Sequence, residues 1–396
     1  MIRLTRTLVA AAALSLGLVL PAQAFDTSAE AAFVLDQTTS TVLLSKNADT
    51  PLPPASMSKL MTLYLAFEAV RDGRLALDEE LRVSAHAAGF GGSTLFLQED
   101  ERVSVKDLLR GVVVLSGNDA SVVLAEHLSP TGTEAGFAEL MTQRAQQMGM
   151  TNSTFENASG WPAEGHRMSM RDLVLLARHL IEDFPEFYEM FAEEEFLFDE
   201  NERANRFNRN PLLGLGIGAD GLKTGHTQEA GYGLVGSATQ EGRRVIFAIT
   251  GLDSAQARAN ESEAIVNWAF RQFAERRIVT EGTAIAQADL WLGAQDSVGL
   301  VTDRDVTLLL PTSPVGGLDA EVVYTGPIDA PVRAGQQLAE LIIRPEGLPE
   351  TRVPLYAESD VAGGGFVDRM MTVSRTLAAR VAGGRGEGEP VSGEAM

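Results

Sequence analysis

The sequence predicts an α+β domain, built on an antiparallel sheet flanked by helices, followed by a small all-β domain. From Phe33 to Ala274, strand-like runs occur at the start and near the end, with helical patterns between them. After Arg277, short β-like runs are separated by Gly and Pro turns, and helical spacing almost disappears. The chain has 396 residues, more than one typical core holds, so two domains are expected.

Within the first domain, hydrophobic spacing and turn residues predict the elements in order. The segments are a hairpin over 33–47, a helix over 57–73, a helix–loop–helix unit over 105–128, two strands over 231–252 and an amphipathic helix over 261–277. Because strands lie at both ends of this order and helices in its middle, one antiparallel sheet with helices on both sides is expected.

The first domain is assigned to residues 25–274 and the all-β domain to 275–362. Strand-like runs of the second domain lie at 305–311, 320–326 and 338–345. Short strands separated by turns are typical of a sandwich.

Residues 363–382 predict an amphipathic helix with a mostly cationic polar face, of the kind that lies in a membrane interface. The alternative is an ordinary surface helix packed on the β domain. The last residues, 383–396, are expected to be disordered.

The first 24 residues have the layout of a secretory signal peptide. Arg3 and Arg6 form a short cationic start, residues 8–20 are apolar, and residues 22–24 form a small-x-small cleavage site. The apolar run is too short to span a membrane. The protein is therefore expected to be exported, with a mature chain that begins near Phe25.

Charge and cysteine content exclude several classes of function. A formal net charge of -22 repels a phosphate backbone, so nucleic acid is not an expected partner. The absence of cysteine excludes disulfides, thiol nucleophiles and cysteine-ligated metals. An exported chain without cysteine favours a bacterial periplasmic protein large enough to fold without crosslinks.

Three short motifs carry candidate chemistry. Ser56-Met57-Ser58-Lys59 begins a helix, Ser116-Gly117-Asn118 lies at a break between two helical segments, and Lys223-Thr224-Gly225 lies at the edge of a probable strand. Each motif alone is weak evidence, since a chain of this length contains such triplets by chance. Their joint order and spacing are far more specific.

Ser56 is the candidate nucleophile, because a serine hydroxyl needs an adjacent base and Lys59 lies on the same helix face one turn away. A lysine in a desolvated pocket near other cations has a lowered pKa and can accept the serine proton. The positive end of the helix favours the negative charge that develops there.

The other two motifs supply supporting groups. Ser116 can pass a proton between Lys59 and a leaving group, and Asn118 can bind a substrate amide or the lysine. Lys223 offers a second cation for a substrate carboxylate, which Thr224 can also bind. Gly225 is expected to let a substrate backbone approach the strand edge.

Other candidate motifs lack the flanking elements or the clustering that their function requires. Residues 216–221 fit GxGxxG by letter, but no strand precedes them and no helix follows. Four histidines, His86, His127, His166 and His179, are scattered and are interpreted as surface or core residues. His226 directly follows the third motif and is kept as a candidate substrate-binding residue.

With these residues in place, the chain resembles a D-alanyl-D-alanine carboxypeptidase, a low-molecular-mass penicillin-binding protein. The resemblance runs from about Ala32 to the C-terminus and includes segments 53–62, 91–128, 208–214 and 220–238. It implies a penicillin-binding transpeptidase-like domain with an antiparallel sheet flanked by helices, then an all-β domain and an amphipathic tail.

The resemblance also implies a reaction and its site. Ser56 would be the acylated serine, Lys59 the proton acceptor, Ser116 the second active serine and Lys223 the residue for the substrate carboxylate. The substrates would be peptidoglycan stem peptides, β-lactams would acylate the same serine, and no metal or organic cofactor would be needed. The protein would work in the periplasm, attached peripherally to the outer face of the inner membrane.

Three alternatives remain open at this point. A class A β-lactamase would need a separate glutamate near the pocket, and Glu193, Glu194 and Glu195 lie between the second and third motifs. A non-catalytic peptidoglycan-binding or β-lactam-sensing module would keep the pocket without turnover. An endopeptidase that cuts cross-links would use the same residues.

Overall fold

The computed structural model describes residues 25–312, 318–345, 348–365, 370 and 393–394. The predicted signal peptide therefore lies outside the described residues, as does almost all of the amphipathic helix predicted over 363–382. The same holds for most of the tail predicted to be disordered. Of that tail, Gly393–Glu394 is described, as a short strand that pairs with a strand of the β domain.

The first domain is built on a five-stranded antiparallel sheet in the order β2-β1-β7-β6-β5. Its strands are β1 (Ala31–Asp36), β2 (Thr41–Lys46), β5 (Ala219–Thr227), β6 (Gly231–Gln240) and β7 (Arg243–Leu252). The hairpin predicted over 33–47 and the strand pair predicted over 231–252 are both confirmed. Because β5 ends the order, one of its two edges has no partner among the described strands.

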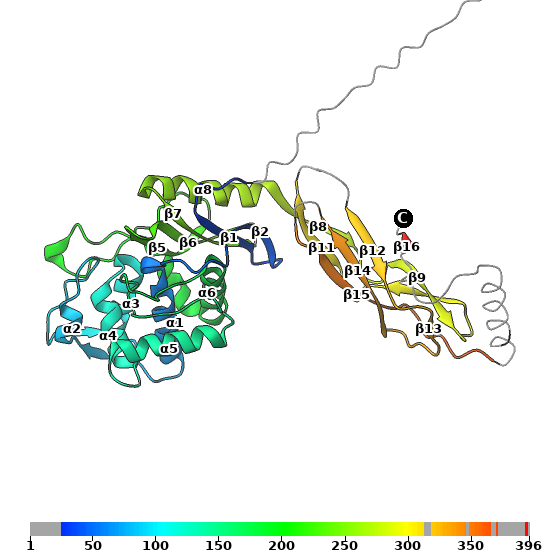
Figure 1. Cartoon of the computed structure of the whole chain (residues 1–396), viewed down its shortest axis with the longest axis horizontal. Helices are drawn as coiled ribbons and strands as arrows, with labels where there is room; N and C mark the ends of the chain where they lie inside the picture. The colour runs from blue at the N-terminus through cyan, green and yellow to red at the C-terminus, as the bar shows by residue number, and fades with distance from the viewer. Residues whose placement is uncertain (1–24, 313–317, 346–347, 366–369, 371–392, 395–396) are drawn as a thin grey trace, which may run out of the picture.

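Helices cover both faces of this sheet, as predicted. Along β7, Phe247 packs into the core that contains helix α8 (Ala255–Gln272), whereas Ile246 and Ala248 pack into the larger core around helix α1 (Lys59–Arg71). This alternation follows from the two-residue period of a strand. Figure 1 shows α8 along one face of the sheet and the other helices of the domain on the opposite side.

The remaining elements of this domain lie between β2 and β5. The helices are α2 (Ala85–Ala88), α3 (Val105–Arg110), α4 (Asn118–Leu128), α5 (Glu134–Gln147), α6 (Met170–Asp183) and α7 (Pro185–Tyr188). The shorter turns are η1 (Ala55–Ser58), η2 (Gly111–Leu115, a π-helix), η3 (Glu189–Ala192) and η4 (Glu200–Glu202). A small ribbon joins β3 (Glu80–Arg82) to β4 (Arg102–Ser104).

Helix α1 is buried almost all round, so it is a core helix rather than a surface one. Its Phe67 is fully buried and stacks on Phe187 with ring centroids 4.9 Å apart. Phe184 and Phe191 contact the same ring. This aromatic cluster fixes the helix whose first residue is Lys59.

The helix predicted over 261–277 ends earlier than expected, at Gln272. Residues Phe273–Val279 instead form strand β8, which pairs with β11 (Val306–Pro311). Tertiary pairing with a distant strand overrides the helical tendency of these residues, a contact that local spacing does not reveal. Leu309 of β11 packs into the core around α8, while its neighbour Leu308 packs into the core of the β domain.

The second domain is all-β, as predicted. Its main sheet has the order β13-β9-β10-β15-β14-β12-β16, and the β8–β11 ribbon adds Val306 and Leu308 to the same core. The other strands are β9 (Ala284–Trp291), β10 (Ser297–Val301), β12 (Asp319–Val323), β13 (Ile328–Asp329), β14 (Gln337–Arg344), β15 (Thr351–Ala357) and β16 (Gly393–Glu394). In Figure 1 this domain extends from the end of α8.

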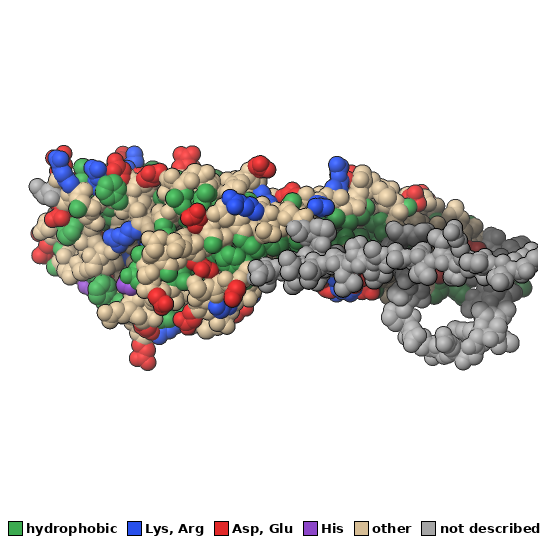
Figure 2. All heavy atoms as spheres, turned by 90° about the horizontal axis from the view of Figure 1, so that it is seen from above, with side chains coloured by type: hydrophobic (Ala, Val, Ile, Leu, Met, Phe, Trp, Pro, Cys, Tyr) green, Lys and Arg blue, Asp and Glu red, His purple; other side chains and the backbone are tan. Residues whose placement is uncertain are grey.

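Two surface features bear on possible partners. Figure 2 shows acidic and basic side chains interspersed over the described residues of the face that it presents. Across the described part of the chain, no helix combines the length and apolar character needed to cross a membrane.

Replacement of Phe67 by alanine is expected to lower the free energy of unfolding by about 3–5 kcal/mol, because it leaves a cavity at the centre of the aromatic cluster. The matched control is Phe207→Ala, since Phe207 is 56% exposed and Phe67 is fully buried. Urea unfolding followed by circular dichroism measures both values. Equal losses in the two variants would contradict the role assigned to this cluster.

Candidate active site

The first motif folds as predicted, with Ser56 and Lys59 on one face of a helical start. Ser56 lies in the turn η1, and Lys59 is the first residue of α1. Their three-residue spacing brings Lys59 Nζ to 2.8 Å from Ser56 Oγ. Ser56 is partly exposed, while Lys59 is fully buried. The Ser56 hydroxyl is therefore partly open to solvent, whereas the adjacent Lys59 amine is shielded from water.

Two further acceptors fix the Lys59 amine. Lys59 Nζ donates to Asn118 Oδ1 at 2.7 Å and to the backbone oxygen of Ser159 at 2.5 Å. Together with Ser56, they match the three donors of a protonated lysine. The Asn118 amide is oriented in turn, because its Nδ2 donates to the Gly91 backbone oxygen at 2.8 Å.

Burial lowers the pKa of Lys59 to about 7, since an ammonium loses its hydration in this environment. The nearby cation of Arg209 lowers it further, and the carboxylates of Asp119 and Glu134 oppose the change. Near neutral pH a substantial share of Lys59 is therefore the neutral amine, which can accept a proton.

The second motif occupies a break between helices, also as predicted. Ser116 ends the π-helix η2 with φ at 61°, in the left-handed region that a residue with a Cβ rarely adopts. The chain then turns, and Asn118 begins α4. The break brings Asn118 to Lys59 and keeps Ser116 buried two residues away. Strained backbone of this kind is common at functional sites.

The third motif lies on the edge strand β5. Lys223 is buried, and its Nζ donates to the Thr224 backbone oxygen at 3.3 Å. Burial holds the pKa of Lys223 well below its usual range, and the charges of Lys59, Arg209 and Arg258 add to the effect. This electrostatic coupling of Lys223 to Lys59 ties the third motif to the first. Thr224 is also nearly buried beside it.

Gly225 packs closely against the turn that carries Ser56, a contact that the sequence did not suggest. A Cβ at this position would lie 2.9 Å from the Pro54 backbone oxygen and 3.0 Å from Met57 Cγ. The glycine therefore lets β5 pack against the turn that carries Ser56, and close approach of a substrate at Gly225 stays a prediction. His226, the next residue, is exposed and stacks on Tyr232 with ring centroids 3.8 Å apart.

Sequence reasoning missed two arginines near the lysines. Arg209 donates to Ser93 Oγ at 2.5 Å, and Arg258 of α8 donates to the Arg209 backbone oxygen at 3.4 Å. The Arg209 residue is exposed as a whole, but neighbouring atoms remove water from its guanidinium, and this desolvation lowers its pKa. Arg209 lies within the family-like segment 208–214, which was a usable signal. No sequence signal marked Arg258, because an arginine on a helix is common.

Two acids of the run 193–195, which could have supplied a β-lactamase glutamate, pair with arginines. Glu193 pairs with Arg110 at 2.7 Å, and Glu195 lies 3.4 Å from Arg206. The carboxylate closest in sequence to the second motif, Asp119, accepts backbone N–H groups of Leu95 at 2.9–3.0 Å. These contacts give the three carboxylates structural roles.

Comparison with known proteins agrees with this geometry. The sequence profile of the D-alanyl-D-alanine carboxypeptidase family matches residues 19–254. That of the penicillin-binding protein 5 C-terminal domain matches residues 273–362.

Curated relatives cover most of the chain. D-alanyl-D-alanine carboxypeptidase DacC of Escherichia coli is 34% identical over 350 residues, which is 86% of each chain. DacF of Bacillus subtilis is 31% identical over 346 residues, 86% of this chain and 87% of the relative.

Solved structures show the same fold. The D-alanyl-D-alanine carboxypeptidase DacD from Francisella tularensis superposes with a TM-score of 0.75 at 27% identity, covering 88% of this chain and 97% of that one. Penicillin-binding protein D2 from Listeria monocytogenes, in its ampicillin-bound form, has a TM-score of 0.56 at 34% identity, covering 62% and 98%. The chain therefore belongs to the S11 peptidase family of D-alanyl-D-alanine carboxypeptidases, with a second domain of the penicillin-binding protein 5 type.

Proposed function

We propose that this protein is a serine-type D-Ala-D-Ala carboxypeptidase that removes the terminal D-alanine from peptidoglycan stem pentapeptides through an acyl-enzyme on Ser56. The observation that carries the proposal is the fully buried Lys59 amine, 2.8 Å from Ser56 Oγ, with its pKa lowered to about 7. The relatives named for this activity supply the substrate.

In acylation, neutral Lys59 accepts the proton of Ser56 as Oγ attacks the carbonyl between the last two D-alanines. The new C–O bond forms, the C–N bond breaks, and the leaving amine takes a proton that reaches it from Lys59 through Ser116. Backbone N–H groups, including that of Ser56, would stabilise the negative oxygen of the tetrahedral intermediate. Free D-alanine and a neutral Lys59 result.

In deacylation, water attacks the ester carbonyl. Its proton passes to Lys59 and then to Ser56 Oγ as the ester bond breaks, which releases a tetrapeptide and restores the free enzyme. No metal or organic cofactor takes part in this scheme.

The cations near Lys223 would hold the carboxylate of the terminal D-alanine. Lys223 is buried, and Arg209 presents a guanidinium at the surface that also contacts Ser93. Thr224 can donate its hydroxyl to the same carboxylate, and His226 marks the next position along the strand edge. Two cations near one anion favour its binding, and Arg209 also favours the neutral form of Lys59.

β-Lactams are proposed as covalent inhibitors, because their strained amide presents a similar carbonyl to Ser56. The ampicillin-bound relative from Listeria monocytogenes supports this assignment.

Location and domain roles complete the proposal. The layout of residues 1–24 supports export to the periplasm, and the amphipathic pattern of 363–382 supports peripheral attachment to the outer face of the cytoplasmic membrane. We divide the chain into a catalytic domain over 25–274 and a β domain over 275–362. The β domain would act as a spacer or a docking surface.

Purified protein is expected to be labelled by fluorescent penicillin and to release D-alanine from diacetyl-Lys-D-Ala-D-Ala. Both signals should fall by roughly a thousandfold or more in Ser56→Ala, because the nucleophile is lost. The matched control is Ser58→Ala, since Ser58 Oγ donates to the Ala55 backbone oxygen at 3.1 Å and should not be acylated. That variant should still form the penicillin adduct.

The alternatives give different results in the same assay. Labelling without D-alanine release would favour a β-lactam sensor or an endopeptidase, and rapid loss of label with penicillin turnover would favour a β-lactamase. Absence of labelling in the unaltered protein would contradict the acyl-enzyme itself.

The rate of acylation by penicillin is expected to rise with pH through a midpoint near 7, because only neutral Lys59 accepts the proton and burial lowers its pKa to about 7. Arg209→Gln removes a cation, so the pKa of Lys59 should rise and the midpoint should move to higher pH by roughly 0.3–0.5 unit. Stopped-flow fluorescence from pH 5 to pH 10 measures this shift.

The control for charge alone is Arg178→Gln, because Arg178 pairs with Glu182 on α6 and faces solvent. It should leave the midpoint in place. A midpoint that stays fixed in Arg209→Gln, or moves to lower pH, would contradict the electrostatic coupling between Arg209 and Lys59.

A further inference from the structure

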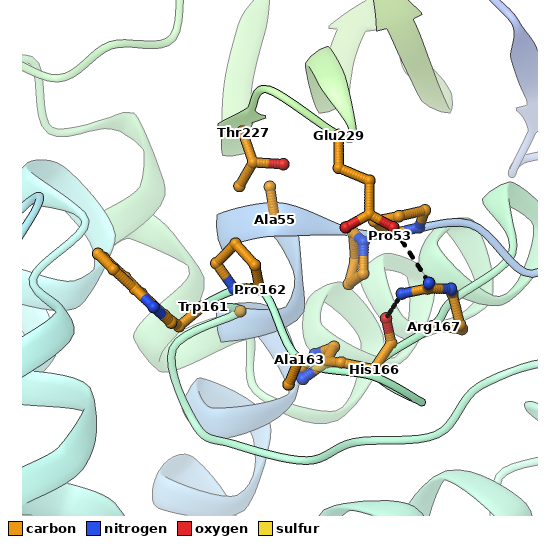
Figure 3. Close-up of a pocket in the computed structure, with 11 residues that line it drawn as sticks. Pro53, Ala55, Trp161, Pro162, Ala163, His166, Arg167, Thr227 and Glu229 are labelled. Carbon is orange, nitrogen blue, oxygen red and sulfur yellow. Dashed lines mark hydrogen bonds and ion pairs between the residues drawn. The ribbon is translucent and has the colours of Figure 1, made fainter.

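The loop over 157–167 supplies one acceptor of the Lys59 amine, the backbone oxygen of Ser159. Figure 3 shows part of this loop beside Ala55, the residue before the proposed nucleophile. The contact is close, because a Cβ on Gly160 would lie 1.9 Å from the Ala55 backbone oxygen. Whatever fixes this loop therefore also fixes where the Ser159 oxygen meets the amine.

A hydrogen-bonded turn gives the loop its local shape. Asn157 Oδ1 accepts the backbone N–H of Ser159 at 3.2 Å and that of Gly160 at 2.8 Å. The Gly160 N–H belongs to the same planar peptide unit as the Ser159 oxygen, so the first contact orients the second group. These bonds lie within the loop, and they do not attach it to the helices around it.

Two side chains from helices attach the loop at Ala158, which is fully buried. The Ala158 backbone N–H donates to Glu134 Oε1 at 3.0 Å, and its backbone oxygen accepts from Thr62 Oγ1 at 2.7 Å. Thr62 lies on α1 three residues after Lys59, and Glu134 is the first residue of α5. Both polar groups of Ala158 are therefore held by helices, directly before the residue whose oxygen meets the amine.

Glu134 is itself held in place. Its side chain is 11% exposed, and its Oε2 lies 3.0 Å from Nε2 of His86 on α2. The positive end of α5 favours a carboxylate at this position, and a carboxylate is a stronger acceptor for a buried N–H than a neutral group is. Both carboxylate oxygens are engaged, so Glu134 can hold the Ala158 backbone in one position.

The charge of Glu134 also reaches the Lys59 amine. It raises the pKa of Lys59, against the larger effect of burial, whereas Arg209 lowers it. Removal of either charged group should therefore move this pKa in opposite directions. The other charged or titratable groups coupled to the amine or to Glu134 are Asp119, His166, Lys223 and His86.

We propose that Glu134 is a positioning residue for the acylation of Ser56, because it holds the Ala158 backbone and so keeps the Ser159 oxygen where Lys59 donates to it. This inference rests on the function proposed above for Ser56 and Lys59. Glu134 acts through the loop and would not touch the substrate. Its hydrogen bond and its charge can be separated, since glutamine keeps the acceptor oxygen and removes the charge, whereas alanine removes both.

The test measures acylation by fluorescent penicillin in the full protein, by stopped flow from pH 5 to pH 10. Glu134→Ala leaves the buried Ala158 N–H without its acceptor, so the plateau rate at high pH should fall about tenfold or more. Glu134→Gln should stay within about twofold of the unaltered plateau, because the amide oxygen can accept the same N–H.

The pH profile supplies a second readout, which a purely structural role would not move. In Glu134→Gln the midpoint should move to lower pH by roughly 0.3–0.5 unit, because a carboxylate no longer stabilises the protonated Lys59. This direction is opposite to that expected for Arg209→Gln. The matched control is Glu139→Gln, which removes the same charge from an exposed position of α5 and should change neither the plateau nor the midpoint. Rates are taken per labelled enzyme, so a misfolded fraction does not alter them.

The outcomes separate this role from the proposed function. An unchanged plateau in Glu134→Ala would overturn the positioning role and leave the carboxypeptidase standing. Equal losses in the alanine and glutamine variants would also overturn it, because only glutamine keeps the hydrogen bond. A midpoint that stays fixed in Glu134→Gln would show that its charge does not act on Lys59, and would overturn that part. If the unaltered protein is not labelled, the proposed function fails and the positioning role fails with it.

Discussion

Burial of the Lys59 amine against the Ser56 hydroxyl is the constraint on which the rest of the structure depends. A charged lysine is costly to bury, so the site must supply acceptors for the amine while keeping its pKa low. Asn118 and the Ser159 backbone oxygen provide the acceptors, and they come from two different segments of the chain. Helix α4 and the loop before α6 must therefore both be fixed against α1, which explains why α1 is a core helix.

Close backbone packing holds Ser56 in place. Ala55 adopts a φ of 47°, and a Cβ on Gly160 would lie 1.9 Å from its carbonyl oxygen. Gly225 approaches the same turn from β5. Two glycines thus let the loop and the edge strand contact the segment before Ser56 from separate directions. The two contacts fix the position of the segment that leads to the Ser56 hydroxyl.

Local patterns predicted much of this arrangement, and contacts between distant segments account for the remainder. The hairpin, α1, the break at Ser116 and the strand pair all follow from spacing and turn residues, and three motifs predicted the site. The end of α8 was wrong because β8 depends on pairing with β11. Arg209 was missed for a related reason, although it lies in the family-like segment 208–214. It acts on Lys59, which is far away in sequence, and local spacing does not reveal such a contact.

The positive charge near Lys223 favours one position for an anion. Lys223 lies in the middle of β5, and the charge of Arg209 acts on it. In the proposed reaction an anionic chain terminus would be favoured there, and the overall negative charge of the protein would repel it elsewhere. One of these cations, Arg209, also lowers the pKa of Lys59. In the proposed reaction, departure of the carboxylate with D-alanine would restore the full effect of Arg209 on Lys59, which would favour the neutral amine that deacylation requires.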